Sequence, residues 1–326
     1  MTQSNFSGSD SAVGVFIVGG IGDISFQLSL MLEKRIIPTL PLICSESQAN
    51  KVYSISRELS SLHLSLQDLS EIRIITVSDK LYQSAFQELE SSANKSSLTG
   101  PFVSYNHILK QAVVCGWVGC SSSVHDLLTN SLSWPITYST YNYLRSDFLT
   151  ELPHAKAPKE IKKSMLVMLD ANSVFVDASV LTNFLQRSIR ASTLQGIEDF
   201  IYICNDSYGN GRPDLTENKA SVSLSQASID VFEGIVSSIK HNNYNFSVLS
   251  NPSFDTLLCS LKSSSILLSL RSGICDLAWL LGKEILSIYP SRNDFSVYKL
   301  SQHDKIVFEV DESDHSPILV HTQSFC

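Results

Sequence analysis

Short apolar runs alternate with amphipathic stretches along most of the chain, and this alternation restricts the folds that it can adopt. The first half has apolar runs at residues 13–18, 40–44, 72–77 and 113–118, and amphipathic stretches at residues 24–34, 48–59 and 81–93. The apolar runs are too continuous to have a wet face, which is typical of strands that helices cover on both sides. The pattern therefore predicts an α/β fold with a parallel sheet.

A polar segment at Leu152–Lys163 interrupts this pattern and then the pattern restarts. The segment contains two prolines and four lysines, which indicates a hinge between domains. Beyond it we expect strands at 165–169, 200–204, 246–249, 266–270 and 285–289, and helices at 180–189, 227–240, 256–262 and 274–281. The sequence thus predicts two Rossmann-like domains with parallel sheets, residues 1–152 and 153–326, that face one another across a cleft. Ligands of such sheets bind at the carboxyl ends of the strands.

Composition excludes several classes of protein. The formal charge of −8 over 326 residues argues against a nucleic-acid partner, because a phosphate backbone requires a basic surface. No apolar stretch is long enough to cross a bilayer, and the polar start MTQSNFSGSDSA lacks the features of a signal peptide. The seven cysteines are scattered without a CxxC pair. We therefore expect a cytoplasmic protein.

The segment Ser264–Arg292 carries the strongest chemical signal. An apolar strand is followed directly by Arg271, Ser272 and Gly273, and then by a helix with Asp276 in its first turn. Amides at the start of a helix bind anions, a serine there can cap the helix, and a guanidinium matches the geometry of phosphate. In the plainer interpretation the helix is capped and Arg271 and Asp276 form a surface salt bridge. Spacing alone leaves both interpretations open.

This segment resembles the donor-domain motif of bacterial glycosyltransferases with the GT-B fold, especially heptosyltransferase-like and surface-polysaccharide transferase-like families. Ser272 and Gly273 match the common part, and Tyr289–Pro290 ends the next strand as in the second group. Arg271 stands where heptosyltransferases have Asp, and Asp276 stands where they have His, so the resemblance does not imply ADP-heptose as the donor. It implies that Arg271, Ser272, Gly273 and Asp276 bind a nucleotide-sugar.

Two loops extend the resemblance. Leu169–Ser173 looks like the loop that reaches the donor phosphates, with Asn172 and Ser173 as side-chain donors; an ordinary helix cap is the alternative for Ser173. Gly19–Asp23, GGIGD, is similar to the glycine turn of the acceptor side, where Gly20 and Gly22 shape the loop. In that family the Asp, here Asp23, takes a proton from the acceptor hydroxyl. Its alternative role is to cap a helix beginning at Ile24.

Other cofactor motifs are incomplete or missing. GGIGDIS does not complete GxGxxG, because Ser25 fills the last glycine position, and Asp23 would repel a pyrophosphate. The sequence has no GxxxxGK[ST], no HExxH and no clustered His/Cys set, so we expect neither a metal nor a cofactor.

The resemblance therefore implies a metal-independent, inverting glycosyltransferase. It would move a sugar from a nucleotide-sugar donor to a glycan or lipid-linked acceptor in bacterial surface polysaccharide or lipopolysaccharide synthesis. A lipid-linked acceptor would bring the chain into peripheral contact with the inner face of the inner membrane. The alternatives are a non-catalytic binding or scaffold subunit of the same fold, a sugar-nucleotide 2-epimerase, and an unrelated two-domain binding protein of the periplasmic type. The missing signal-peptide features argue against the last of these.

Overall fold

The computed structural model divides the chain into two compact units, Met1–Tyr141 and Asn142–Cys326. It describes residues 12–17, 20–22, 24–25, 28, 42–62, 74–93, 103–106, 111–115, 163–169, 176, 178–194, 196–204, 245–301, 304–311 and 313–323. The expected domain boundary at residues 152 and 153 and the expected helix at 227–240 lie outside these residues. Each unit contains one sheet with helices, as the α/β prediction requires.

The first unit contains a five-stranded sheet in the order β3-β2-β1-β5-β4. Its strands and helices are β1 (Ala12–Phe16), β2 (Leu42–Ser45), α2 (Glu46–Leu62), β3 (Ile74–Val77), α3 (Asp79–Ala93), β4 (Val103–Asn106) and β5 (Gln111–Cys115). The pairs β1–β2, β2–β3 and β1–β5 are parallel, whereas β4 pairs antiparallel with β5. The expectation of a purely parallel sheet is therefore wrong at this edge, because β4 and β5 form a short hairpin.

The second unit contains a seven-stranded sheet in the order β11-β12-β10-β9-β6-β7-β8. Its elements are β6 (Ser164–Met168), α6 (Ala178–Leu194), β7 (Asp199–Cys204), β8 (Asn245–Ser250), α8 (Phe254–Ser263), β9 (Ile266–Leu270), α9 (Gly273–Leu280), β10 (Glu284–Tyr289), α10 (Arg292–Tyr298), β11 (Lys305–Glu309) and β12 (Ile318–Thr322). The strands β8, β7, β6, β9 and β10 run parallel in the order 3-2-1-4-5 of a Rossmann sheet.

The last two strands of this sheet differ from the parallel prediction. β12 pairs antiparallel with β10 on one side and with β11 on the other. The sheet is therefore mixed, and its antiparallel part is confined to one edge. Such edges occur on many otherwise parallel sheets.

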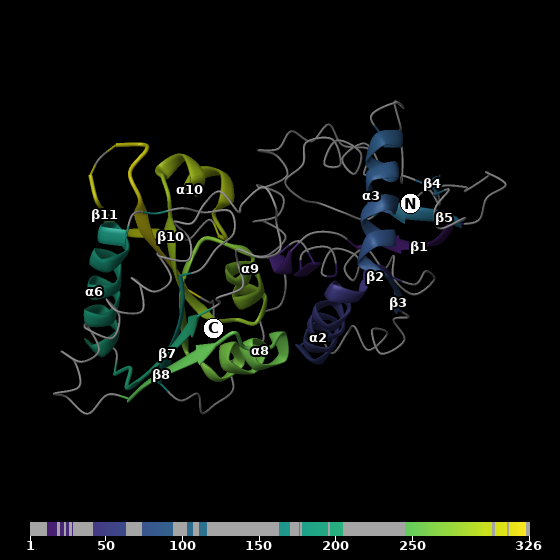
Figure 1. The fold of residues 1–326 in the computed structure, drawn as a ribbon. Coiled ribbons are helices and arrows are strands. Elements are labelled where there is room, and N and C mark those ends of the chain that lie inside the picture. The colour runs from purple at the N-terminus through teal and green to yellow at the C-terminus, as the bar shows by residue number, and fades with distance from the viewer. Residues whose placement is uncertain are drawn as a thin grey trace. The chain divides into compact units, whose positions relative to one another are not determined.

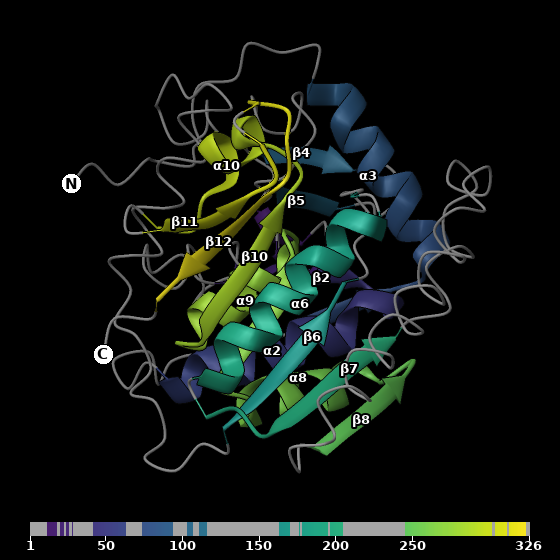
Figure 2. The same ribbon diagram turned by 90° about the vertical axis from the view of Figure 1, so that its left-hand side faces the viewer.

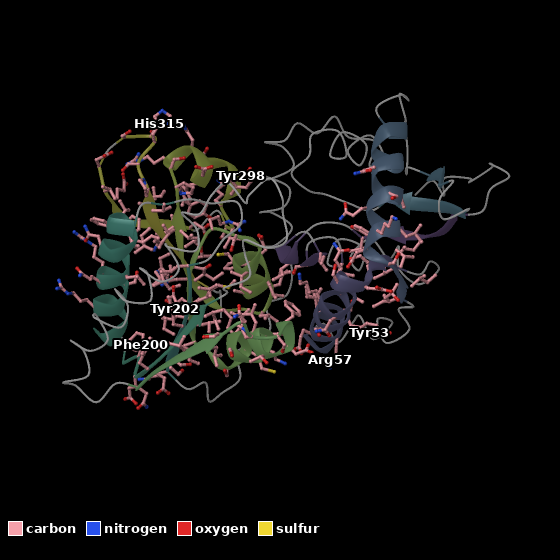
Figure 3. The ribbon with its side chains drawn as sticks, viewed as in Figure 1. Tyr53, Arg57, Phe200, Tyr202, Tyr298 and His315 are labelled. Atoms are coloured by element: carbon pink, nitrogen blue, oxygen red, sulfur yellow. The ribbon has the colours of Figure 1, made fainter. Side chains whose placement is uncertain are left out.

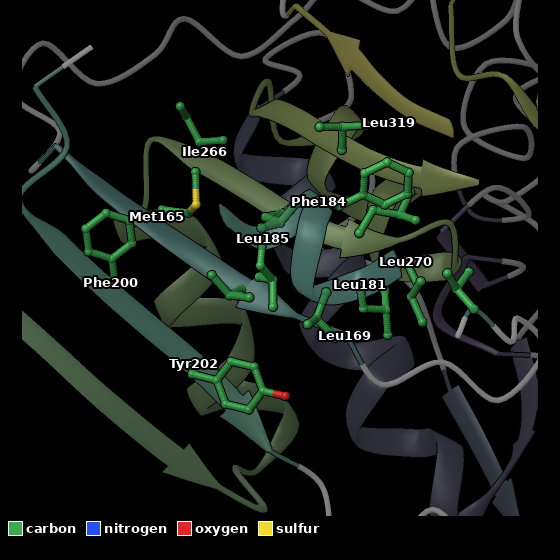
Figure 4. Packing of buried hydrophobic residues seen from close by; sticks show 14 of the residues in the cluster. Met165, Leu169, Leu181, Phe184, Leu185, Phe200, Tyr202, Ile266, Leu270 and Leu319 are labelled. Carbon is green, nitrogen blue, oxygen red and sulfur yellow. The ribbon is translucent and has the colours of Figure 1, made fainter. Parts of the chain in front are cut away.

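Helices cover both faces of the second sheet. α6 lies on one face, and α8 and α9 lie on the other, as two perpendicular views show (Figures 1 and 2). β6 and β9 are buried along their whole length, because each strand packs against helices on both sides. The core on the α6 side includes Phe184 and Leu185 of α6 and Met165 of β6, which Figure 4 labels, and Leu268 of β9 belongs to the same cluster of buried residues.

Phe184 also joins α6 to the antiparallel edge. Its ring meets that of Phe308 in β11 edge to face, with the centroids 5.5 Å apart and the planes at 83°. The Arg187 guanidinium lies over the Phe308 ring, 3.5 Å from its centroid. An aromatic pair of this geometry adds to the stability that burial alone provides.

The connection between α9 and β10 depends on a glycine. Gly282 has a φ of 69°, in the left-handed region, and follows the end of α9. Its N–H donates to the Trp279 carbonyl, and the Lys283 N–H donates to the Ala278 carbonyl, as in a Schellman cap. This turn directs the Lys283 side chain to the end of α8, where Nζ donates to the carbonyls of Lys262 at 2.6 Å and Ser264 at 2.8 Å.

We predict that Phe184→Ala destabilises the second unit by about 3–5 kcal/mol, because it removes a fully buried ring and leaves a cavity. Asn183→Ala, an exposed neighbour on the same helix, should change stability by no more than about 0.5 kcal/mol. Urea unfolding of both variants measures the difference. Equal effects of the two substitutions would contradict the packing described for α6.

We also predict a pH-dependent contribution from Lys283. Burial, and then the charge of Lys262, lower the pKa of Lys283 from 10.5 to about 8. Between pH 8 and pH 10.5, Lys283 is therefore protonated in the unfolded chain and deprotonated in the folded chain. The free energy of unfolding should rise with pH over this range. The rise should amount to at most roughly 3 kcal/mol.

Lys283→Met should abolish this rise, and urea unfolding across this range of pH measures it. Lys80→Met, which removes an exposed lysine of α3, is the control for the loss of one charge. A Lys283→Met variant with the same pH dependence as the wild type would refute the assignment.

Candidate functional site

The turn between β9 and α9, residues 271–273, lies at the point where the order of the parallel strands reverses. β9 pairs with β6, the first strand of the unit, and with β10, the next strand along the chain. β6 and β9 are parallel, so the chain leaves both of them at the carboxyl ends of the strands. The connection after β6 leads to β7 on one side, and the connection after β9 leads to β10 on the other side. This topological switch point is where open α/β sheets bind ligands.

Arg271 is the first residue after β9, and its side chain is buried. Its backbone N–H still donates to the Ile288 carbonyl at 2.8 Å, which continues the ladder between β9 and β10. The guanidinium forms two parallel hydrogen bonds with Asp276, from Nη1 to Oδ2 at 3.2 Å and from Nη2 to Oδ1 at 2.9 Å. The side chains of Arg271 and Asp276 are only 8% and 4% exposed, so this ion pair is shielded from water.

Two carbonyl groups complete the surroundings of the guanidinium. Nη1 of Arg271 donates to the Ser272 carbonyl at 2.9 Å, and Nε donates to the Tyr298 carbonyl at 2.8 Å. Tyr298, labelled in Figure 3, is the last residue of α10. Its carbonyl also accepts from the hydroxyl of Tyr289 at 3.1 Å. Arg271 therefore links the turn to the end of α10.

The charges at this turn sit in a buried environment. Burial is the largest influence on the pKa of Arg271 and by itself would lower it, but the charge of Asp276, with smaller contributions from Tyr289, Cys275 and the hydrogen bond to Asp276, raises this pKa above its usual value. Burial raises the pKa of Tyr289 and of the Cys275 thiol, so both remain neutral. Burial likewise raises the pKa of Asp304, although its carboxylate accepts hydrogen bonds from the N–H groups of Leu300 and Ser301.

The start of α9 presents donors. Ser272 occupies the N-cap position with extended backbone, and its carbonyl accepts from the Cys275 N–H at 2.9 Å. Within the described part of the chain, no acceptor faces the N–H groups of Ser272, Gly273 and Ile274. The Ser272 side chain makes no capping hydrogen bond, so the expectation that its hydroxyl caps the helix is wrong. These donors and the helix dipole favour an anion.

The salt bridge considered from the sequence is present, but it is buried instead of lying at the surface. A separation of five residues brings Arg271 back to Asp276 because the turn is tight and Asp276 lies in the first turn of α9. The burial could not be read from the segment itself. One contact of the buried Arg271 comes from α10, a helix that the sequence pattern did not predict, through the Tyr298 carbonyl.

The other predicted donor loop and the predicted base are not described. Asn172 and Ser173 lie outside the described residues, as does Asp23. Of the glycines predicted to shape an acceptor-side loop, Gly20 is exposed, and Gly22 is buried and lies in a helix. The Ile24 N–H donates to the Gly20 carbonyl at 2.9 Å, so the helix begins at Ile21, before the expected Ile24.

A carboxylate that the sequence analysis missed lies at the carboxyl ends of the parallel strands of the first sheet. Asp79 follows β3, and its Oδ1 accepts from the Ser47 hydroxyl at 2.8 Å and the Ser47 N–H at 3.3 Å. The hydroxyl of Ser47 also lies 3.0 Å from that of Ser45. Hydrogen bonds from Ser47 and then Ser45 lower the pKa of the exposed Asp79. The signal was available, because Ser78–Asp79 directly follow an apolar strand.

Metal clusters and membrane-spanning helices are both absent from the described residues. No three His, Cys, Asp or Glu side chains in this part of the chain are arranged to hold a metal ion. No described helix is long and apolar enough to cross a membrane.

Comparisons with known proteins give structural likeness alone. No protein-family model matches the sequence, and no curated protein matches it. The structure is similar to that of E. coli heptosyltransferase WaaC with ADP-2-deoxy-2-fluoro heptose, with 13% identity and a TM-score of 0.41 over 85% of this chain and 88% of that chain. For WaaC with ADP the values are 12% identity and a TM-score of 0.43, over 89% and 92%.

A third structure, E. coli ADP-heptose lps heptosyltransferase II, has 11% identity and a TM-score of 0.41 over 93% of this chain and 92% of that chain. Heptosyltransferases, which the sequence segment resembles, are thus among the solved structures to which this chain is similar. Identity and TM-score are both low, so the likeness adds no argument to the geometry of the turn.

We predict that Asp276→Ala lowers the free energy of unfolding by about 3–5 kcal/mol, because it leaves the buried Arg271 cation without its counter-ion. Urea unfolding measures the loss. The control is Arg292→Ala, which removes the partner of Glu309 in a more exposed ion pair of the same unit. That pair should contribute about 1 kcal/mol or less. A smaller loss for Asp276→Ala than for Arg292→Ala would contradict the burial of the pair.

Proposed function

We propose that this chain is a GT-B-type glycosyltransferase. It would transfer a sugar from a nucleotide-activated donor to a glycan or lipid-linked acceptor in bacterial surface polysaccharide or lipopolysaccharide synthesis. The observation that carries the proposal is the β9–α9 turn, whose unpaired amides lie at the switch point of a 3-2-1-4-5 sheet. The sequence resemblance of RSGICD to the donor motif of these transferases supports the same conclusion.

The chemistry follows from where charge develops. As the sugar leaves the donor, negative charge builds on the nucleotide diphosphate, and fixed donors aimed at it lower the barrier. In our proposal these donors are the amides of Ser272–Ile274 and the hydroxyl of Ser272, together with the side chains of Asn172 and Ser173. Arg271 and Asp276 belong to the same donor site, and the transfer requires no metal.

The acceptor hydroxyl is a weak nucleophile and needs a base. We propose Asp23, which directly follows Gly22 in the sequence, for this role. A carboxylate that takes the proton as the hydroxyl attacks leads to inversion at the sugar carbon. Asp79 is a second carboxylate just after the carboxyl end of β3, which β2 separates from β1, and Ser47 holds it ionised. It is therefore the natural comparison for Asp23.

The donor class is tested by thermal unfolding in the presence of UDP-, GDP-, ADP-, dTDP- and CMP-linked sugars. One nucleotide family should raise the melting temperature, because a ligand at a hundred times its dissociation constant adds about 2.7 kcal/mol of stability. No shift with any of these donors, for folded protein, would refute the proposal. Tight binding without turnover of any donor would instead favour a non-catalytic subunit, and epimerised donor among the products would favour a 2-epimerase.

With the donor known, the base is tested by substitution. Asp23→Asn should leave donor affinity unchanged and lower turnover by about 10²- to 10⁴-fold, because the amide cannot accept the proton. Asp79→Asn, measured in parallel by product formation, should retain turnover. A loss confined to Asp79→Asn would assign the base to Asp79, and near-normal turnover of Asp23→Asn would remove Asp23 from the role.

A further inference from the structure

The buried Arg271–Asp276 pair has a geometry that differs from that of a phosphate-binding arginine. A guanidinium that binds phosphate presents its fork of N–H donors to the ligand. Here the fork of Arg271 faces Asp276, with both Nη atoms bonded to the carboxylate. Nε is also occupied, by the Tyr298 carbonyl. The side chain is satisfied within the protein and is only 8% exposed.

The remaining hydrogen bond of Arg271 fixes the orientation of the Ser272–Gly273 peptide. Nη1 donates to the Ser272 carbonyl, which also accepts from the Cys275 N–H. A peptide unit is planar and trans, so its carbonyl and its N–H point in opposite directions. Holding the Ser272 carbonyl toward Arg271 therefore directs the Gly273 N–H away from Arg271. No described residue accepts from that N–H or from the N–H of Ile274.

The guanidinium is itself held from two sides. Asp276 fixes its plane through two hydrogen bonds, and the Tyr298 carbonyl fixes Nε. The Tyr289 hydroxyl donates to the same carbonyl, so the end of α10 is tied to β10 as well as to Arg271. The orientation of the turn thus depends on contacts from β10, α9 and α10, and not on the turn alone.

We propose that Arg271 and Asp276 are positioning residues, which hold the Ser272–Gly273 peptide so that backbone amides of the β9–α9 turn bind the diphosphate. This inference rests on the proposed function and specifies how the donor is bound. The diphosphate interacts with the amides and with the Ser272 hydroxyl, while the guanidinium stays bonded to Asp276. A planar fork is needed because four hydrogen bonds leave it in three directions, toward the Asp276 carboxylate, the Ser272 carbonyl and the Tyr298 carbonyl.

The competing model is direct binding, in which Arg271 leaves Asp276 and bonds to phosphate. The two models differ in what Asp276 does. If Arg271 binds phosphate directly, Asp276 competes for it, so Asp276→Asn should leave affinity unchanged or increase it. If the pair positions the turn, Asp276→Asn should weaken binding although it removes a negative charge from the neighbourhood of an anion. Arg271→Lys also separates the models, since a lysine can bind phosphate but cannot make the bonds of the fork.

The experiment measures the dissociation constants of inorganic pyrophosphate and of UDP, GDP, ADP and dTDP by calorimetry, for the wild type, Asp276→Asn, Arg271→Lys and the double variant. We expect each single substitution to weaken binding by about tenfold or more. We expect the double variant to lose no more than either single one, because both act through one contact. Unchanged or tighter binding by Asp276→Asn, or wild-type affinity in Arg271→Lys, would overturn the inference.

Two controls separate positioning from a general loss of stability. Phe184→Leu perturbs the core on the α6 side and should lower stability without changing the dissociation constant. Arg292→Lys alters the partly exposed ion pair with Glu309 and should change neither stability nor the dissociation constant. Loss of affinity in Phe184→Leu in proportion to its loss of stability would overturn the positioning role, because binding would then follow stability alone.

Amide hydrogen exchange of the unliganded protein tests the same inference without a nucleotide. Asp276→Asn should speed exchange of the Cys275 N–H, which is bonded to the Ser272 carbonyl, and should leave exchange in β7 unchanged. Unchanged exchange at Cys275 would overturn the inference even if nucleotides bind. If Asp276→Asn speeds exchange at Cys275 but the wild type binds no nucleotide, the donor function is refuted and the role of the pair in holding the turn is retained.

Discussion

The parallel pairing of β6 with β9 is the constraint on which the second unit depends. Both strands are buried along their full length, so helices must cover both faces of the sheet, and the connections must leave these two strands toward opposite ends of the strand order. The same pairing creates the switch point at which the β9–α9 turn lies. Core packing and the candidate donor site therefore have one structural origin.

Much of this arrangement could be predicted from continuous apolar runs. Ile266–Leu270 forms a strand with the expected bounds, because five apolar or small residues between polar ends leave few alternatives. The antiparallel edge was not predicted. In β11 polar residues flank apolar ones, and its sides are partly exposed, so it lacks the signal of a buried strand. α10 has only seven residues and is held by its Ser291 cap, and so it shows little periodicity.

The candidate site, too, could be predicted only in part from the sequence. Their spacing after a strand singled out Arg271, Ser272, Gly273 and Asp276, but it left open whether they form a ligand site or an ion pair, and only the resemblance to glycosyltransferases favoured the ligand site. The burial of the ion pair could not be inferred, because the surroundings of the pair include distant parts of the chain, such as the Tyr298 carbonyl 27 residues further along. Asp79 was missed for a different reason: a polar residue after a strand is common, and only the contact with Ser47 distinguishes it.

The position of β12 has a consequence for how the second unit assembles during synthesis. β12 is the last described strand in chain order, yet it lies inside the sheet, between β10 and β11. Until residues 318–322 have left the ribosome, β10 has an open edge and β11 has no partner among the described strands. A growing chain can thus pair β6, β7, β8, β9 and β10 but cannot close this edge. Such an edge is a site for pairing with other chains, so nascent chains stalled before β12 should be prone to aggregate.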